Sequence, residues 1–271
     1  MANISRTAAV AFALSSFVIG VSARSLTTVA TAGRKLKPVK LHMYDHCPYC
    51  IRVELYLLRN SIPYTRHLYN YGSGAPPSKK GYDSHGGPKV LMGSKVLPVL
   101  ETSSGLMLGE SLEIVNWLTH SYPITRPVGC AADPGGYKEW RGGGFGTVKS
   151  KLVRPRITNL THLKDWSDPR DVEYARHKYS LMGFDYAAAL SGTASLVSSM
   201  NVHLSDLAAV LEEGEGGGIT VQKGGFSMDD ICLLPDLRSL TVVEGIVWPK
   251  KVRRYLEEGC RGVELYDDYK S

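Results

Sequence analysis

The stretch KLHMYDHCPYCIRVELYLLR, residues 40–59, places two cysteines between a strand and a helix. Its first five residues, Lys40–Tyr44, alternate polar and apolar side chains, a pattern that predicts a β-strand. From Ile51 to Arg59, apolar side chains recur at helical spacing, which predicts an α-helix. The motif Cys47-Pro48-Tyr49-Cys50 therefore lies on the turn between the two elements, with Cys47 at the amino end of the helix.

A cysteine at the start of a helix is well placed to react. Unpaired backbone N–H groups and the helix dipole stabilise a thiolate there, and such cysteines have a pKa of roughly 3.5–7.5 instead of about 8.5. Pro48 suits the first helical turn, where its missing N–H group costs nothing. We therefore predict that Cys47 is a nucleophile and that Cys50, one turn further on, resolves the mixed disulfide that Cys47 forms.

Two other uses of a Cys-x-x-Cys pair are zinc binding and a structural disulfide. A closed zinc site needs two more ligands. The remaining cysteines, Cys130, Cys232 and Cys260, stand alone, with no second Cys-x-x-Cys and no paired histidines. A disulfide between adjacent helical turns closes a very short loop and stabilises little. Redox chemistry is therefore the favoured interpretation, and no metal is expected.

The net charge of +6 in 271 residues does not indicate a nucleic-acid partner. Six of the 32 basic residues fall in residues 1–40, which contain no acidic residue. The remaining 26 basic residues are balanced by 26 acidic ones, so the body from Leu41 onward is formally neutral. It lacks the basic surface that binding to nucleic acid requires.

Residues 1–40 are predicted to be a targeting leader. An apolar run from Ala8 to Val21 ends in a small-x-small cleavage pattern, and it is short for a membrane span. The Ser/Thr-rich, acid-free stretch Ser25–Lys40 resembles a transit peptide. A plastid or secretory route is favoured, while a mitochondrial presequence and an uncleaved amphipathic anchor remain open. The sequon at Asn159 would matter only on the secretory route.

The order of elements in residues 41–120 is that of a thioredoxin-like domain. After the first helix, we predict strands over Ile62–Leu68, Val96–Leu100 and Gly105–Leu108, a helical turn at Val90–Met92, and a helix from Glu110 to about His120. A proline does not fit within a central strand, so the Leu97–Pro98 bond is expected to be cis and to end the preceding loop. The Gly- and Pro-rich segment Asn70–Pro88 is long enough to be an insertion.

Residues 121–136 are predicted to be a linker, residues 137–262 an all-helical domain, and residues 263–271 a tail. Helical spacing predicts helices near residues 137–154, 168–183, 198–213, 227–243 and 249–258. Residues 212–218 are expected to form a flexible turn. A glycine run, residues 142–146, does not fit a phosphate-binding loop, because no strand precedes it and no Gly-Lys-Ser/Thr follows.

The motifs along the chain resemble those of the two-domain glutaredoxins of the glutaredoxin 2 type. The resemblance covers about Leu41 to Glu258 and is carried by the segments Tyr44–Cys50, Leu97–Leu100, Gly109–Ser111, Ser227–Ile231 and Leu240–Pro249. The Cys-Pro-Tyr-Cys motif alone is typical of glutaredoxins, and its combination with Glu110-Ser111 and a helical second domain is more specific. The resemblance implies an α/β thioredoxin-like domain followed by an all-α domain, in a glutathione-transferase-like architecture.

The resemblance also implies what the site does. Cys47 would attack glutathionylated or disulfide substrates, and Cys50 would resolve protein disulfides, with glutathione as the co-substrate. The implied glutathione-binding residues are Tyr49, Arg52, Leu97, Pro98, Glu110 and Ser111. The backbone of Leu97 would pair with the cysteinyl part of glutathione, while Glu110 and Ser111 would hold its γ-glutamyl end. Arg52 would attract the glycyl carboxylate or support the thiolate, although such a residue is as often a solvated helix charge.

The chain departs from the family pattern in several places. The Gly72–Gly86 region looks inserted near the active face, Leu97 is larger than the usual valine, and the glycine run replaces a regular helix. The leader has no counterpart in bacterial members. Substrate range is therefore open.

Two other functions are compatible with the motifs: a cysteine-type glutathione transferase or dehydroascorbate reductase, and a non-catalytic redox sensor or membrane-inserting relative. The second thiol, Cys50, favours a glutaredoxin over a transferase. The expected partners are glutathione and disulfide-bonded or glutathionylated proteins, without nucleic acid, and the chain is expected to be a monomer.

Overall fold

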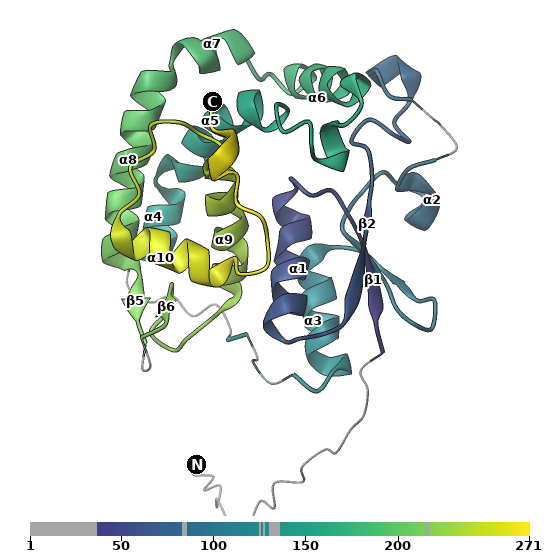
Figure 1. Ribbon diagram of the computed structural model, residues 1–271, viewed down its shortest axis with the longest axis horizontal. Coiled ribbons are helices and arrows are strands. Elements are labelled where there is room, and N and C mark those ends of the chain that lie inside the picture. The colour runs from purple at the N-terminus through teal and green to yellow at the C-terminus, as the bar shows by residue number, and fades with distance from the viewer. Residues whose placement is uncertain (1–36, 83–85, 125, 127, 130–135, 215–216) are drawn as a thin grey trace, which may run out of the picture. The chain divides into compact units, whose positions relative to one another are not determined.

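The computed structural model describes residues 37–82, 86–124, 126, 128–129, 136–214 and 217–271 (Figure 1). Nearly all of the predicted leader lies outside these described residues, as do part of the predicted linker and Cys130. Within the described ranges, no helix combines the length and the apolar character that crossing a bilayer requires.

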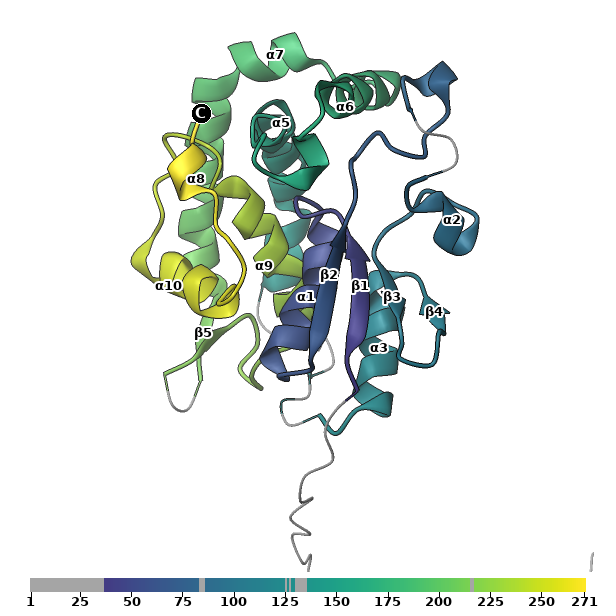
Figure 2. The same cartoon turned by 45° about the vertical axis from the view of Figure 1, so that its right-hand side comes forward.

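The first domain is built on a four-stranded sheet with the order β2-β1-β3-β4, whose strands lie side by side in Figure 2. The strands are β1 (Val39–Met43), β2 (Tyr64–Leu68), β3 (Val99–Glu101) and β4 (Met107–Leu108). β1 and β2 run parallel, whereas β3 is antiparallel to both of its neighbours. The parallel pair needs a crossover, and the helix that carries the cysteine motif provides it.

Three helices complete this domain: α1 (Pro48–Arg59), α2 (Lys89–Met92) and α3 (Ser111–Ser121). α1 and α3 contact each other. Figure 1 shows these two helices on the side of the sheet that faces the second domain, with α2 on the other side. The observed order of strand, helix, strand, hairpin and helix confirms the predicted thioredoxin-like domain.

The peptide bond between Leu97 and Pro98 is cis, as predicted. β3 begins at the next residue, Val99, so the proline stands before the ladder of strand hydrogen bonds and does not interrupt it. The predicted strand Val96–Leu100 includes a proline, but the observed strand is shorter than this apolar run and excludes Pro98.

The segment predicted as an insertion is held against the second domain by one buried carboxylate. Asp171 accepts hydrogen bonds from the Gly72 N–H at 2.7 Å, from Asn70 Nδ2 at 2.8 Å and from the Tyr82 hydroxyl at 2.6 Å. A short 3₁₀ turn, Pro77–Lys79, lies within the segment. The described part of the insertion therefore has a fixed path beside the second domain.

The second domain consists mainly of helices. They are α4 (Tyr137–Trp140), α5 (Gly146–Ile157), α6 (Pro169–Leu181), α7 (Tyr186–Ser191), α8 (Thr193–Val210), α9 (Met228–Leu240) and α10 (Lys250–Gly259). Short 3₁₀ turns occur at Lys164–Trp166 and Asp267–Tyr269. α9 is almost completely buried. It contacts α5 within its own domain and α1 of the first domain. This central helix therefore joins the cores of the two domains.

The prediction of one helix over residues 198–213 was wrong at both of its ends. α8 begins five residues earlier, at Thr193, and a separate helix, α7, precedes it. Asp185 caps α7 by accepting a hydrogen bond from the Ala188 N–H at 2.9 Å. The segment that contains the starts of α7 and α8 is rich in alanine and serine and has little apolar periodicity. The spacing of apolar residues therefore gave no signal for the start of either helix.

The predicted helical character of the second domain is confirmed, but the turn expected at residues 212–218 is shorter than predicted, because Glu212–Glu213 belong to a strand. Glu212–Glu213 (β5) and Ile219–Thr220 (β6) form a two-stranded antiparallel hairpin. Strands of two residues are too short to produce an alternating pattern that sequence inspection detects. The domain is therefore mostly helical.

The glycine run divides the predicted helix over residues 137–154. α4 ends at Trp140, a π-helical turn spans Arg141–Phe145, and α5 starts at Gly146. Within this turn, Gly144 has a φ of 98°, a conformation that favours glycine. The glycines therefore form a kink between two helices.

Residues 263–271 pack onto the second domain. Tyr266 is fully buried, and its N–H donates a hydrogen bond to the Thr241 hydroxyl at 2.7 Å. The Ser271 N–H donates to the Val242 carbonyl at 3.1 Å. The end of the chain thus contributes to the core around the carboxyl end of α9.

Candidate active site

Cys47 stands at the N-cap of α1, the position that the sequence predicts. Its backbone is extended, Pro48 occupies the first helical turn, and the side chain is partly buried. The Cys50 thiol donates a hydrogen bond to the Cys47 sulfur, and His46 and the N–H groups of Tyr49 and Cys50 also favour the anion. These interactions outweigh burial and lower the pKa of Cys47 to about 6, so the thiolate is the main form at neutral pH.

Cys50 has the opposite environment. It is completely buried, and the Tyr44 N–H donates a hydrogen bond to its sulfur at 3.4 Å. Burial, followed by the hydrogen bond to Cys47 and the adjacent negative charge, raises the pKa of Cys50 well above its usual value. One thiol is therefore a partly buried anion and the other a fully buried, protonated thiol, which is the asymmetry that nucleophile and resolving thiol require.

The low pKa of Cys47 predicts how its reactivity depends on pH. Because the thiolate is the reactive form, alkylation by iodoacetamide should rise tenfold per pH unit below about 6 and level off above it. The rate would be measured by mass spectrometry of the Cys47 peptide, with Cys232 as the internal reference. Burial raises the pKa of Cys232, so its alkylation should still be rising at neutral pH. A midpoint for Cys47 above 8 would contradict the described hydrogen bonding.

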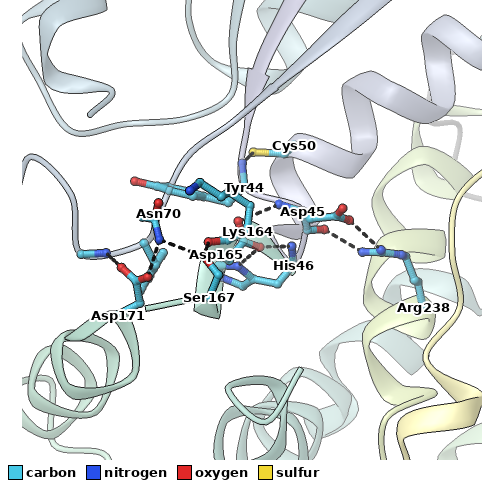
Figure 3. A network of polar contacts seen from close by, with 12 residues as sticks. Tyr44, Asp45, His46, Cys50, Asn70, Lys164, Asp165, Ser167, Asp171 and Arg238 are labelled. Carbon is cyan, nitrogen blue, oxygen red and sulfur yellow. Dashed lines mark hydrogen bonds and ion pairs between the residues drawn. The ribbon is translucent and has the colours of Figure 1, made fainter. Parts of the chain in front are cut away.

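The turn that carries Cys47 is held from the second domain by Asp165 (Figure 3). This carboxylate is fully buried and accepts hydrogen bonds from the N–H of Asp45 at 3.1 Å and the N–H of His46 at 2.7 Å. It also contacts the His46 ring nitrogen Nδ1 at 2.9 Å. Asp165 therefore fixes both the backbone before Cys47 and the imidazole that lowers the pKa of the thiol.

Arg238 of α9 holds the same turn from the other side (Figure 3). Its guanidinium donates to the Asp45 carbonyl at 2.8 Å and to Asp45 Oδ1 at 2.9 Å, and it also donates to the Glu264 carbonyl at 2.7 Å. The other carboxylate oxygen of Asp45 accepts from Arg66 at 2.6 Å. The side chain of Arg238 is almost completely buried. The helical domain is therefore part of the support of the reactive turn.

A cavity of about 530 Å³ opens beside Cys47. Residues of both domains line it: Tyr44, His46, Cys47, Pro48, Tyr49, Arg52, Tyr71, Lys95, Val96, Leu97, Arg141, Gly146, Lys149, Ser150, Val153, Arg154, Ile157, Lys178, Tyr179, Asp236 and Ser239. This volume lies in the range of small-molecule sites, and its wall combines aromatic rings with basic groups. The cavity is suited to an anionic ligand placed against the thiolate.

Lys95 is a partly buried basic residue in this wall. Its ammonium donates a hydrogen bond to the Tyr44 hydroxyl at 2.8 Å and another to the Tyr71 carbonyl, and it lies 4.8 Å from the centre of the Tyr174 ring. Burial, and to a smaller extent Lys178, lowers the pKa of Lys95 to about 7. An anion in the cavity would favour its charged form.

The predicted glutathione-binding residues fall into two groups. Tyr49, Arg52 and Leu97 line the cavity, and the Arg52 guanidinium lies 4.6 Å from the centre of the exposed Tyr49 ring. The backbone N–H and carbonyl of Leu97 form no hydrogen bond within the described part of the chain. An extended peptide can use such free groups.

Pro98, Glu110 and Ser111 do not line the cavity. Glu110 nevertheless has an unusual backbone, with a φ of 60° and a ψ of 113°. A non-glycine residue with positive φ is strained, and such strain is concentrated at ligand sites. Ser111, which is buried, then begins α3, where the first N–H groups have no partner within the helix.

Several residues of the site are absent from the sequence prediction: His46, Lys95, Lys149, Arg154, Asp165, Lys178 and Arg238. His46 adjoins the cysteine motif and could have been considered from its position alone. The others lie far from the motif in the sequence and look like ordinary helix or loop charges. Among the described residues, no group of three or more His, Cys, Asp and Glu side chains is arranged to hold a metal ion.

Comparison with known proteins supports this description of both domains. Residues 138–269 match the family described as glutaredoxin 2, C-terminal domain, and residues 46–121 match the family described as glutathione S-transferase, N-terminal domain. Glutaredoxin 2 of Escherichia coli K12 is 25% identical over 227 residues, which cover 84% of this chain and 96% of the relative.

Solved structures agree with these matches. The crystal structure of glutaredoxin 2 from Salmonella typhimurium in complex with glutathione is similar, with a TM-score of 0.73 and 25% identity over 86% of this chain and 99% of the other. The glutathione transferase GSTFuA3 from Phanerochaete chrysosporium has the same fold, with a TM-score of 0.55 and 15% identity over 83% of this chain and 97% of the other. The resemblance to the glutaredoxin 2 type, with its glutathione-transferase-like architecture, is thus confirmed.

Proposed function

Since the chain resembles glutaredoxin 2 in both of its domains, we propose that it is a glutathione-dependent thiol–disulfide oxidoreductase. One observation carries the proposal: Cys47 has a pKa lowered to about 6 while its neighbour Cys50 is a buried, protonated thiol. The pair occupies the start of α1 beside a cavity large enough for glutathione.

The reaction on a glutathione mixed disulfide needs Cys47 alone. Its thiolate attacks the glutathione sulfur, an S–S bond forms between Cys47 and glutathione, and the substrate thiolate leaves and takes up a proton. A second glutathione, as thiolate, attacks this adduct, which regenerates the Cys47 thiolate and releases oxidised glutathione. His46 and the backbone N–H groups stabilise the Cys47 thiolate as the attacking and the leaving group.

The reaction on a protein disulfide uses both thiols. Cys47 attacks one sulfur and forms a mixed disulfide with the substrate, while the other substrate thiolate leaves. Cys50 then loses its proton and attacks Cys47, which releases the reduced substrate and leaves a Cys47–Cys50 disulfide. Two glutathione molecules reduce that disulfide. Burial and the neighbouring Cys47 thiolate both raise the pKa of Cys50, so Cys50 stays protonated before the first attack. In the mixed disulfide the negative charge of Cys47 is gone, and Cys50 can lose its proton more easily.

Glutathione would bind along the first domain. The free backbone groups of Leu97, directly before Pro98, would pair with its cysteinyl residue. The N–H and hydroxyl of Ser111 would bind the γ-glutamyl carboxylate, and Glu110 its ammonium group. Arg52, stacked on Tyr49, would attract the glycyl carboxylate.

The rival functions are less well supported. A transferase needs only one activated sulfur and has no use for a second thiol. Here the second thiol, Cys50, donates a hydrogen bond to Cys47 and lowers its pKa. A purely regulatory pair would not need a cavity beside the thiolate. Disulfide-bonded or glutathionylated proteins are the proposed substrates. The residue 1–40 leader is proposed to direct the chain to a plastid or the secretory route.

The replacement Cys50→Ser separates the two reactions. We expect this variant to keep most of its turnover with a small glutathione mixed disulfide and to lose most of its turnover with a protein disulfide, because only the second reaction needs a resolving thiol. Both would be followed by NADPH consumption through glutathione reductase. The matched control is Cys232→Ser, which removes a cysteine that does not line the cavity. Loss of both activities in a folded Cys50→Ser variant would contradict the single-thiol reaction.

A further inference from the structure

The cavity beside Cys47 contains more positive charge than its carboxylates neutralise. Six cationic side chains line it: Arg52, Lys95, Arg141, Lys149, Arg154 and Lys178. The one carboxylate in the lining, Asp236, binds Lys149 at 2.5 Å and also pairs with Arg141. The other four cations form no ion pair with a described residue.

Two of the unpaired cations, Arg154 and Lys178, come from the second domain and are held by aromatic rings. The Arg154 guanidinium lies 4.5 Å from the centre of the Tyr179 ring and 5.0 Å from that of Phe184. The Lys178 ammonium donates a hydrogen bond to the Tyr71 hydroxyl at 2.8 Å. Both side chains are partly buried. Their positions are therefore fixed without a counter-ion.

Arg154 and Cys47 both act electrostatically on Lys178. Burial is the largest cause of the lowered pKa of Lys178, Arg154 lowers it further, and the negative charge of Cys47 raises it. Two cations that repel each other next to a reactive thiolate are stabilised when an anion binds between them. The glutathione contacts proposed above all come from the first domain, so these two cations are available to the other half of a mixed disulfide.

We propose that Arg154 and Lys178 bind carboxylates on the part of the disulfide substrate that is not glutathione, so that the enzyme prefers cysteines flanked by acidic residues. This inference rests on the proposed function and names its substrate class, an acidic peptide segment around the disulfide. Basic side chains in fixed positions are a common means of recognising acidic motifs.

The same charges assist the chemical step. When the Cys47 thiolate attacks the glutathione sulfur, the S–S bond breaks and the peptide sulfur leaves as a thiolate, which later takes up a proton. The negative charge that develops on the peptide sulfur is repelled by the flanking carboxylates, and Arg154 and Lys178 offset this repulsion when they bind those carboxylates. Glutathione supplies the two electrons, as in the proposed cycle.

The test compares three tripeptides, Asp-Cys-Asp, Asn-Cys-Asn and Lys-Cys-Lys, each joined to glutathione through its cysteine. The values of kcat/KM are measured at low salt with the full chain and a fixed glutathione concentration. We expect the acidic substrate to exceed the neutral one by about fivefold, and the neutral one to exceed the basic one. High ionic strength should reduce these differences, because salt screens them.

The variants Arg154→Gln and Lys178→Gln should each reduce the ratio of kcat/KM between the acidic and the neutral substrate by about twofold or more. The matched controls are Lys151→Gln on α5 and Arg176→Gln on α6, which are exposed, do not line the cavity and should leave the ratio unchanged.

Equal turnover of all three substrates by the unmodified chain would overturn the inference and leave the proposed function intact. A raised KM for glutathione in the Arg154 and Lys178 variants, with an unchanged ratio, would assign both cations to the glutathione site and would also overturn it. Absence of turnover with every substrate would instead contradict the proposed function.

Discussion

Replacing Cys47 by serine should reduce turnover with every disulfide substrate to the level without enzyme. A serine hydroxyl is not ionised near neutral pH and cannot form a disulfide, so neither the adduct with glutathione nor the mixed disulfide with a protein can arise. The environment that lowers the pKa of Cys47 to about 6 has no effect without the sulfur. The measurement is glutathione-dependent NADPH oxidation with a small mixed disulfide and with a disulfide-bonded protein.

The control for this variant is Cys232→Ser, the same exchange at a partly buried cysteine of α9 that does not line the cavity. It should retain the activity of the unmodified chain. Circular dichroism and thermal unfolding would show that the Cys47 variant is folded, since the side chain is small and partly exposed. Persistent turnover in the folded Cys47→Ser variant would show that Cys47 is not the nucleophile.

Replacing Arg238 by methionine should lower the free energy of unfolding by about 3–5 kcal/mol. Methionine keeps an unbranched apolar chain in place of the aliphatic part of arginine, but it leaves the buried Asp45 carbonyl and carboxylate without this donor. It also removes the hydrogen bond to the Glu264 carbonyl and the cation over the Tyr266 ring, 4.3 Å from its centre. Urea unfolding followed by circular dichroism measures the loss.

The matched control is Arg254→Met, which removes an exposed ion pair with Glu258 one turn away on α10 and an exposed hydrogen bond to the Gly217 carbonyl. Such a pair contributes about 0–1 kcal/mol, because water screens both charges and competes for them. A similar, small change in both variants would show that Arg238 does not hold the turn. We expect the Arg238 variant to lose clearly more stability than the Arg254 variant.

The reactive centre could be predicted from the sequence because its signals are local. The cysteine motif, the strand before it and the helix after it lie within residues 40–59, so alternation and helical spacing place Cys47 at the helix start. The cis bond before Pro98 followed from a proline inside an apolar run. Each of these inferences needed only neighbouring residues.

The supports of the site could not be predicted, because they depend on contacts between distant residues. Asp165 and Arg238 are more than a hundred residues from the turn that they hold. A sequence shows neither that such a carboxylate is buried nor what it accepts. Arg154 and Lys178 likewise resemble solvated helix charges until the fold places them beside Cys47. The starts of α7 and α8 were missed because an alanine- and serine-rich segment has no distinct apolar face.

The most direct test of the account is to identify the covalent intermediate. The Cys50→Ser variant would be mixed with a glutathione mixed disulfide, quenched in acid and mapped by mass spectrometry of its peptides. We predict one glutathione per chain, attached to Cys47. The other half of the mixed disulfide should be released as a free thiol, and added glutathione should remove the adduct. No adduct on a folded chain with a titratable Cys47 thiol, or an adduct confined to Cys232, would contradict the proposed chemistry.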